Sequence, residues 1–184
     1  MYEGFNYKGK RHGPGKYFFA EGDVYTGEWE EDIKHGLGRY VFSDGSVYEG
    51  GYMQGLKVGV SRYDYANGDV FEGDYLANKR QGAGTLTTAC GDVFEGVYKD
   101  DERHGMGKHT YADGEVFEGV YKHGKRHGLG KHTLLTSEGR SRREVTYVEG
   151  DKCGPDRISH ANGDVHEQHG QSGPLAAPQL GSCA

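Results

Sequence analysis

Aromatic residues and glycines recur in this chain at a constant interval of 23 residues. An aromatic residue opens each of six segments, a glycine follows two positions later, and another glycine stands eleven positions after the aromatic. The opening residues are Tyr2, Tyr25, Tyr48, Phe71, Phe94 and Phe117. A fixed period of this size is typical of repeat proteins, in which each unit packs chiefly against its neighbours. The repetition therefore favours a repeat array over a globular domain with an enclosed catalytic pocket.

The composition agrees with an array of short strands and ordered turns. The 184 residues include 33 glycines and 14 tyrosines, and only 34% of the chain is hydrophobic. This is little aliphatic material for a globular core of this length. Because the glycines are periodic and lie between aromatic residues, they indicate turns rather than disorder.

The second repeat shows the alternation of a β-strand. Tyr25, Gly27 and Trp29 fall on one face of such a strand, and the polar residues between them fall on the other. A glycine between two large rings leaves room for an aromatic side chain from the adjacent strand. We expect the opening rings and the rings four positions later to stack along one face.

The rest of this repeat predicts a loop, a second strand and a tight turn. We expect residues 30–38 to form a polar loop that turns at Gly36 and residues 39–43 to form the second strand. Asp44-Gly45 suits a two-residue hairpin turn. No segment has an apolar stripe of helical period. The predicted fold class is all-β, an elongated meander with two short antiparallel strands per repeat.

The segments Tyr25-Thr26-Gly27-Glu28-Trp29 and Lys34-His35-Gly36-Leu37-Gly38 resemble the MORN-repeat family. The resemblance implies an elongated, curved β-meander used for scaffolding in cytoskeletal, ciliary or membrane-apposed assemblies. It covers residues 1–139 as six repeats: 2–24, 25–47, 48–70, 71–93, 94–116 and 117–139. Residues 140–165 form a degenerate seventh repeat that acts as a cap, and we expect residues 166–184 to be a disordered tail. The segment His166-Glu167-Gln168-His169-Gly170 after the repeats also resembles the radial spoke head member of this family.

Histidines are the first candidates for chemistry. Four of them share one position of the repeat: His12, His35, His104 and His127. Two strands per repeat separate neighbouring copies by about 10 Å, whereas the ligands of one zinc ion lie within about 2.3 Å of it. We therefore expect no metal site. His109 and His132 stand where other repeats carry tyrosine, so we expect them on the packed aromatic face, with a pH-sensitive role as the alternative.

Other motifs of enzymes are absent from the sequence. Gly15-Lys16 and its equivalents lack the earlier glycine and the following helix of a phosphate-binding loop. There is no Gly-x-Ser-x-Gly elbow and no Cys-x-x-Cys pair. The sequence predicts no enzyme activity and no cofactor.

The net charge of −6 gives no general attraction to nucleic acid. No apolar run approaches the roughly 18 residues of a transmembrane segment. The three scattered cysteines and the lack of a signal-peptide pattern predict an intracellular, cytoplasmic location, with a cilium, axoneme or cytoskeletal structure as the setting.

Two surfaces are candidates for binding partners. The first is an aromatic face made of Tyr25, Trp29, Tyr48, Tyr52, Phe71, Tyr75, Phe94, Tyr98, Phe117 and Tyr121. The second is a basic loop edge, which carries Lys10, Arg11, Lys34, Lys57, Lys79, Arg80, Arg103, Lys125 and Arg126. Opposite it, the turn edge is acidic, which suits an acidic partner or a second copy of the chain. Solubility and the preference of aspartate for turns explain the same pattern.

Three functions remain open at this stage. The leading hypothesis is a non-enzymatic scaffold that docks protein partners, with self-association as one form of this, in an axonemal or cytoskeletal assembly. The alternative is a peripheral module that binds anionic phospholipids or phosphoinositides through its basic loop edge. Its best candidate site is Lys122, Lys125, Arg126, Arg140, Arg142 and Arg143. The third is a targeting fragment of a larger lipid kinase or methyltransferase.

Overall fold

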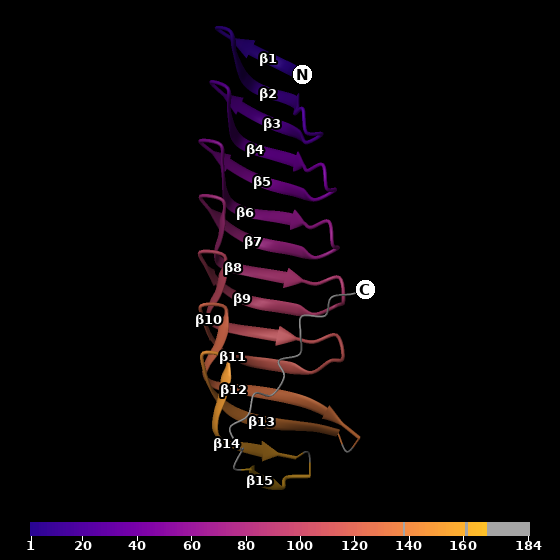
Figure 1. Ribbon diagram of the computed structural model, residues 1–184, viewed down its shortest axis with the longest axis vertical. Helices are drawn as coiled ribbons and strands as arrows, with labels where there is room; N and C mark the ends of the chain where they lie inside the picture. Colours follow the sequence, from indigo (N-terminus) through magenta and orange to yellow (C-terminus); the bar gives the residue numbers. More distant parts are fainter. Residues whose placement is uncertain (138, 161, 169–184) are drawn as a thin grey trace. The chain divides into compact units, whose positions relative to one another are not determined.

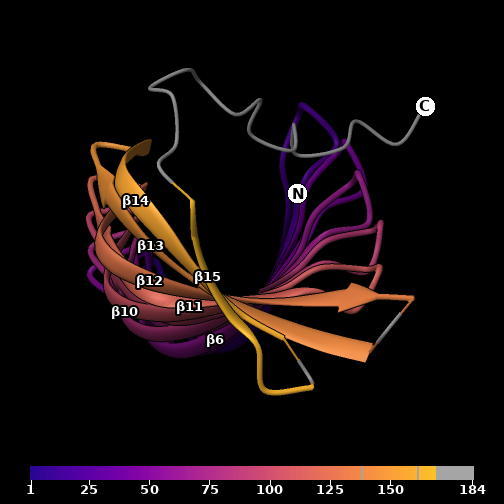
Figure 2. The same ribbon diagram turned by 90° about the horizontal axis from the view of Figure 1, so that it is seen from below.

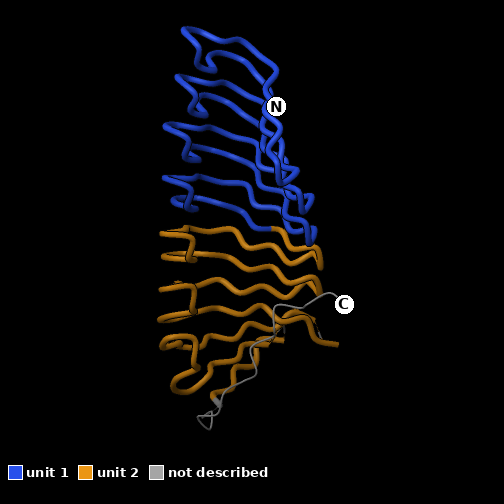
Figure 3. The backbone as a smooth tube through the Cα atoms, turned by 45° about the horizontal axis from the view of Figure 1, so that its top comes forward, with its two compact units in different colours: residues 1–86 blue, residues 87–184 orange. Residues whose placement is uncertain are grey.

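The computed structural model describes residues 1–137, 139–160 and 162–168 (Figure 1). The chain divides into two compact units, residues 1–86 and 87–184 (Figure 3). Unit 1 contains β1 (Tyr2–Tyr7), β2 (Lys10–Phe18), β3 (Val24–Glu30), β4 (Ile33–Val41), β5 (Val47–Met53), β6 (Leu56–Asp64), β7 (Val70–Leu76) and β8 (Lys79–Thr87), which ends at the boundary. Unit 2 contains β9 (Val93–Lys99), β10 (Glu102–Thr110), β11 (Val116–Lys122), β12 (Lys125–Thr136), β13 (Gly139–Val148), β14 (Asp151–Ser159) and β15 (Val165–Gln168).

Within each unit the strands lie in the order of the chain, and neighbouring strands are antiparallel. Each repeat supplies two strands, so the prediction of an all-β meander is confirmed. The last strand, β15, extends three residues into the segment predicted as a disordered tail. Residues 169–184 of that segment lie outside the described residues.

The first turn of each repeat differs from the predicted polar loop over residues 30–38. Instead, β4 begins at Ile33, and only Glu31 and Asp32 separate it from β3. Both turn residues have positive φ, 48° and 73°, which is the geometry of a two-residue hairpin turn whose twist matches that of the strands. The sequence prediction was wrong here because it placed a loop where a nine-residue strand follows the turn.

A glycine bulge explains why this strand resembles a loop in sequence. Gly27 pairs with Gly38, but the next residue, Glu28, pairs with His35, so two residues of β4 are inserted in the ladder. Gly36 lies in this bulge with φ of 60°, a conformation that glycine adopts without steric cost. The loop glycines of the sequence pattern are therefore bulge residues inside a strand.

The second connection of the repeat is longer than the predicted two-residue turn at Asp44-Gly45. β4 ends at Val41 and β5 begins at Val47. The backbone N–H of Phe42 donates to Ser46 O at 2.9 Å, and the N–H of Gly45 donates to Phe42 O at 3.0 Å. The tight and long connections are thus exchanged relative to the prediction.

The core consists of aromatic rings on one face of each unit's single-layered sheet, here called the ring face. Ten rings are at most 5% exposed: Tyr25, Trp29, Tyr48, Tyr52, Phe71, Tyr75, Phe94, Tyr98, Phe117 and Tyr121. Four opening rings, Tyr25, Tyr48, Phe94 and Phe117, each pack edge-on between two others. The centroid of Tyr48, for example, lies 5.3 Å from that of Tyr52 and 5.6 Å from that of Tyr75. Such edge-to-face pairs add roughly 1 kcal/mol each to the hydrophobic burial.

Strand curvature makes this burial possible without a second layer. The strands are visibly bent when seen along the direction in which they stack (Figure 2). Side chains of neighbouring strands cover the rings, as Arg126 does over Phe117. Glycines form the floor: a Cβ on Gly38 would lie within 2.7 Å of three atoms of the Tyr25 side chain.

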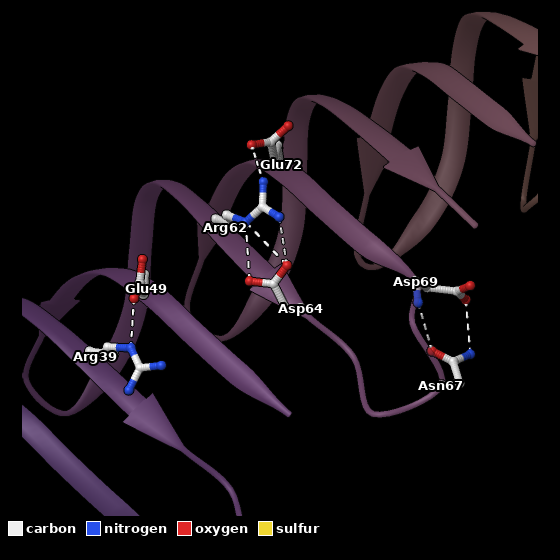
Figure 4. A network of polar contacts seen from close by, with 7 residues as sticks. All are labelled: Arg39, Glu49, Arg62, Asp64, Asn67, Asp69 and Glu72. Atoms are coloured by element: carbon white, nitrogen blue, oxygen red, sulfur yellow. Dashed lines mark hydrogen bonds and ion pairs between the residues drawn. The ribbon is translucent and has the colours of Figure 1, made fainter. Parts of the chain in front are cut away.

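The opposite face of unit 1 carries ion pairs across adjacent strands. Arg39 Nε lies 2.7 Å from Glu49 Oε1, and Arg62 Nη1 lies 2.8 Å from Glu72 Oε1 (Figure 4). These side chains alternate with the ring-face residues of the same strands. Because all four are exposed, each pair contributes little to stability.

Candidate functional site

Basic side chains cover the rings at regular intervals. They are Arg11, Lys34, Lys57, Arg80, Arg103 and Arg126, each 23 residues after the last. Their charged groups lie 4.1 to 5.4 Å from a ring centroid, as for Arg126 over Phe117 and Arg80 over Phe71. This is the range of cation–π contacts. These cations therefore do not form the free basic loop edge predicted from the sequence, because the strand direction turns them onto the ring face.

Lys34 is the most informative of these cations. Its Nζ lies 4.6 Å from the ring centroid of Tyr40, 4.9 Å from that of Tyr52 and 5.6 Å from that of Tyr25. Burial among these rings lowers the pKa of Lys34 from its usual value, and Asp23 opposes this shift. Among the described residues, no carboxylate lies within ion-pair distance of Lys34.

A cavity of about 310 Å³ opens beside Lys34 in unit 1. Its lining consists of Arg11, Phe19, Trp29, Asp32, Ile33, Lys34, Tyr40 and Gly55. The ring of Phe19 lies 5.5 Å from that of Tyr40, and Ile33 is 40% exposed. The cavity thus combines aromatic walls with an accessible aliphatic side chain and a cation, a composition suited to small segments of another chain.

The acidic groups around this cavity already have partners. Asp32 Oδ1 accepts from both the backbone N–H and Nε of Arg11, each at 2.9 Å. Asp23 accepts from the Tyr40 hydroxyl at 2.6 Å and from the backbone N–H of Ser43 at 2.8 Å. These hydrogen bonds lower the pKa of both carboxyl groups, which keeps them ionised and engaged. An incoming anion would therefore meet the charge of Lys34.

The predicted aromatic face is the core of the protein rather than an open docking surface. Trp29, for instance, is 4% exposed, and the opening rings of repeats two to six are 0 or 1% exposed. The accessible aromatic surface beside them comes from second strands and turns, where Tyr40 and Phe19 are only half-buried. The sequence analysis did not select these two residues as binding residues. Aromatic residues nevertheless recur at both of these positions of the repeat, near the end of the second strand.

The six basic residues proposed for lipid binding do not form one cluster: Lys122, Lys125, Arg126, Arg140, Arg142 and Arg143. Arg126 stacks on the buried ring of Phe117. Arg143 Nε lies 2.9 Å from a carboxylate oxygen of Asp156, whose side chain is 0% exposed. Both arginines are thereby committed to contacts within unit 2.

The other four lie at opposite ends of their strands. Lys122 pairs with Lys125 at one end of β11 and β12, whereas Arg140 pairs with Leu135 near the far end of β12. Leu135 lies ten positions after Lys125 along β12, a contour of about 33 Å. A single headgroup cannot bridge them.

His109 and His132 lie on the ring face, as predicted. The ring of His109 stacks on that of Tyr111 at 4.2 Å, and the ring of His132 lies 4.8 Å from that of Phe117. Burial and nearby arginines lower the pKa of both imidazoles to about 4. Both are therefore neutral near pH 7.

Within residues 1–137, 139–160 and 162–168, no group of three or more histidine, cysteine or acidic side chains is placed to hold a metal ion. The same residues contain no helix long and apolar enough to cross a membrane.

The fold and its ring face define a class: repeat proteins made of β-hairpins whose core is a row of aromatic rings over glycines. The family model of the MORN repeat matches residues 2–24, 25–47, 48–70, 71–93, 94–116 and 117–134. The chain therefore belongs to the MORN-repeat family, as the sequence predicted. This assignment fits a protein-interaction or scaffold module.

Solved structures resemble the fold at low sequence identity. One is the TCP domain of SAS-4 (dCPAP) in complex with a proline-rich motif of Ana2 (dSTIL) of Drosophila melanogaster. It has 12% identity and a TM-score of 0.51, over 86% of this chain and 85% of that chain. Another is the TCP10 domain of Danio rerio CPAP in complex with a STIL peptide, with 11% identity and a TM-score of 0.48, over 92% and 83% of the two chains. Among curated proteins, none matches the sequence significantly.

Proposed function

We propose that this protein is a non-enzymatic scaffold module that binds a peptide segment of a partner protein in the cavity beside Lys34. The observation that carries the proposal is an ammonium group that is half-buried among three rings and has no ion pair among the described residues. A desolvated cation without a counterion is costly. A partner carboxylate at this position would form a charge-assisted hydrogen bond.

The cavity walls specify what lies beside that carboxylate. Aromatic grooves accept proline well, because its ring packs flat on them and its backbone loses little entropy on binding. Tyr40 and Phe19 offer such a surface, and Ile33 adds an aliphatic contact. The partner segment is therefore an extended peptide in which Asp or Glu stands next to proline or an aliphatic residue. The TCP domain that shares this fold is in complex with a proline-rich motif of its own partner, which supports this choice.

We propose an axonemal or cytoskeletal assembly as the setting. The support is the family to which the chain belongs and the resemblance of residues 166–170 to the radial spoke head member. Only residues 166–168 of that segment lie in the described part of the chain. No observation favours the phospholipid alternative, because the candidate basic residues are dispersed or committed to internal contacts.

Selection from a library of peptides tests the proposal. The intact chain and its Lys34→Met variant are used as bait, and Lys57→Met serves as the matched control, since Lys57 occupies the same position one repeat later. The wild type and Lys57→Met should enrich acidic peptides that contain proline or aliphatic residues, and Lys34→Met should lose the acidic preference. The same enrichment by all three proteins, or no enrichment, would contradict the proposal.

A further inference from the structure

The face of unit 2 opposite the rings carries a row of apolar side chains in the strands β9 to β12. The row consists of Val97, Met106, Val120 and Leu129. Met106 is 63% exposed, Leu129 is 57% exposed and Val97 is 41% exposed, and Val120 is half-buried. Met106 pairs directly with Val120. Val97 pairs with His104 and Val120 with His127, so Met106 and Leu129 lie in bulges next to these pairs, and the row crosses the strands.

A groove of about 540 Å³ lies beside Met106 and Leu129 of this row. Its lining consists of Glu95, Met106, Gly107, Lys108, Glu118, Gly119, Leu129 and Lys131. The side-chain positions of both glycines point to the ring face, where a Cβ would lie 2.6 Å from the ring of Phe94 or 2.7 Å from that of Phe117, so only their main chain borders the groove. The apolar contact of the groove comes from Met106 and Leu129, charged side chains border it, and Val97 and Val120 extend the apolar strip beside it.

The spacing along the strip matches that of an α-helix. Adjacent strands lie about 4.8 Å apart, so the four residues fall at about 0, 5, 10 and 14 Å along the row. A helix rises about 1.5 Å per residue, so side chains separated by three, four and three residues fall at about 0, 5, 11 and 15 Å. These are the apolar positions of one face of an amphipathic helix.

Charged rows flank the strip on both sides. On one side Glu118 pairs in register with Lys108 and Lys131. Both lysines, however, approach other carboxylates, with Lys108 Nζ 3.6 Å from Glu95 and Lys131 Nζ 3.9 Å from Glu144. Glu118 has no ion pair within the described part of unit 2.

The opposite flank carries three lysines, with Glu102 in register with Lys99. Lys99, Lys122 and Lys125 are exposed beside the turns, and Lys122 and Lys125 pair with each other across β11 and β12. None of the three lies within ion-pair distance of a carboxylate among the described residues. Two like charges in register repel each other, so an acidic side chain placed between them would be stabilised.

We propose that this strip binds an amphipathic α-helix of a partner protein. Its apolar residues follow the three–four–three spacing, and acidic residues on one flank lie against Lys122 and Lys125. A basic residue on the other flank pairs with Glu118. A helix that docks in a groove makes its main contacts through apolar side chains at such periodic positions. The site uses a different unit and a different face from the cavity beside Lys34, so one chain would hold two partners.

Unit 1 provides the natural comparison. Leu37 and Val60 occupy the same positions of the repeat as Met106 and Leu129, and they are 75% and 79% exposed. Leu37 pairs with Gly51, however, and Val60 pairs with Asp74. A glycine and an aspartate therefore interrupt the apolar strip where unit 2 has valines.

The test uses a 16-residue lactam-bridged peptide with leucine at positions 2, 5, 9 and 12, glutamates on one flank and lysines on the other. Fluorescence anisotropy measures its binding to the full chain. Met106→Glu combined with Leu129→Glu should weaken binding by at least about tenfold, because each change places a charge in the apolar contact. Leu37→Glu combined with Val60→Glu is the matched control and should bind as the wild type does. Circular dichroism checks that both double variants remain folded.

A second peptide, in which lysines replace the glutamates, should also bind at least about tenfold more weakly, since it loses the attraction to Lys122 and Lys125. Lack of binding by the wild type at about 100 µM peptide would overturn the proposal, as would equal losses in the two double variants. Vesicles containing phosphatidylserine are tested in parallel. Binding to them that is lost in Met106→Glu with Leu129→Glu, without peptide binding, would assign the strip to a membrane surface and overturn the helix. Lys34→Met leaves this site intact, so its effect on the other cavity is measured separately.

Discussion

Replacing Gly27 with alanine adds one methyl group where the structure leaves no space for it. A Cβ at this position would lie 2.5 Å from Tyr25 Oη, 2.6 Å from Gly38 Cα and 2.7 Å from Leu37 O. Carbon atoms in contact are ordinarily about 3.5 to 4.0 Å apart. Two of the three neighbours are backbone atoms of β4, so a change of side-chain rotamer cannot relieve the overlap.

The destabilisation follows from the movement that β4 would have to make. A shift of about 1 Å would stretch ladder hydrogen bonds beyond their normal range, at about 1 kcal/mol for each bond lost. Displacing the buried ring of Tyr25 adds an overpacking cost of about 1 to 3 kcal/mol. We therefore expect Gly27→Ala to lower the free energy of unfolding of its repeat by about 3 to 5 kcal/mol.

Gly59→Ala is the control that separates steric contact from backbone conformation. Gly59 has φ of +72°, and no atom lies within 4 Å of its ideal Cβ. Its substitution should cost only the left-handed conformation, about 1 to 2 kcal/mol. Guanidinium unfolding followed by fluorescence of Trp29, the single tryptophan, reports on this region because its ring lies 5.1 Å from that of Tyr25. If Gly27→Ala lowers the free energy of unfolding less than Gly59→Ala does, the claim that glycines such as Gly27 make room for the buried rings is refuted.

Three further predictions concern single sites. Ser61→Gly removes a hydrogen bond of 2.7 Å to the hydroxyl of Tyr48 and should cost about 1 kcal/mol in chemical unfolding. Asp156→Asn leaves Arg143 without its buried counterion and should destabilise unit 2 by about 3 kcal/mol, measured by thermal unfolding. The pKa of His132 falls from 6.5 to about 4 in the folded protein, so the unfolded chain binds more protons between these values and stability should decrease as pH falls from about 6.5 to 4. His132→Phe should flatten this pH dependence of the unfolding midpoint.

For each of these three predictions, one experimental result would contradict it. The hydrogen bond of Ser61 is unimportant if Tyr48→Phe and Ser61→Gly have fully additive effects in a double-mutant cycle. An unchanged melting temperature in Asp156→Asn would show that the buried ion pair does not stabilise unit 2. An identical pH profile in His132→Phe would assign the acid sensitivity to other groups.

The period and the alternation of the sequence were sufficient to predict the class of fold and the face on which the rings lie. They did not locate the turns, because the glycine that marks a turn also serves as a bulge residue. Gly36 illustrates this: its positive φ is that of a turn, yet it lies within β4. The residues that form the turn in the second repeat, Glu31 and Asp32, include no glycine, although the equivalent turns of other repeats contain Gly9, Gly55 or Gly124 with positive φ.

The error about the turn also explains the error about the charges. A loop over residues 30–38 would place Lys34 on a solvent-exposed edge. As a strand residue paired with Trp29, it lies over the rings. A signal was present in the sequence, since a basic residue recurs every 23 positions from Arg11 to Arg126. Such regularity is expected of a structural position rather than of a solvated edge.

The cavity itself could not be predicted from the sequence. It depends on the half-buried placement of Phe19 and Tyr40 and on hydrogen bonds that engage Asp23 and Asp32, none of which the repeat pattern specifies. The apolar strip of unit 2 depends in the same way on register, because Val120 lies opposite Met106 only in the assembled sheet.

Isothermal titration of an acidic, proline-containing peptide, taken from the selection, into the intact chain tests the central functional claim most directly. The account predicts that Lys34→Met weakens binding by at least about tenfold, since a charge-assisted contact is worth about 1.5 to 3 kcal/mol. It also predicts that the salt dependence of the affinity falls in this variant, whereas Lys57→Met retains the affinity and salt dependence of the wild type. Equal affinity of the wild type and Lys34→Met would contradict the claim.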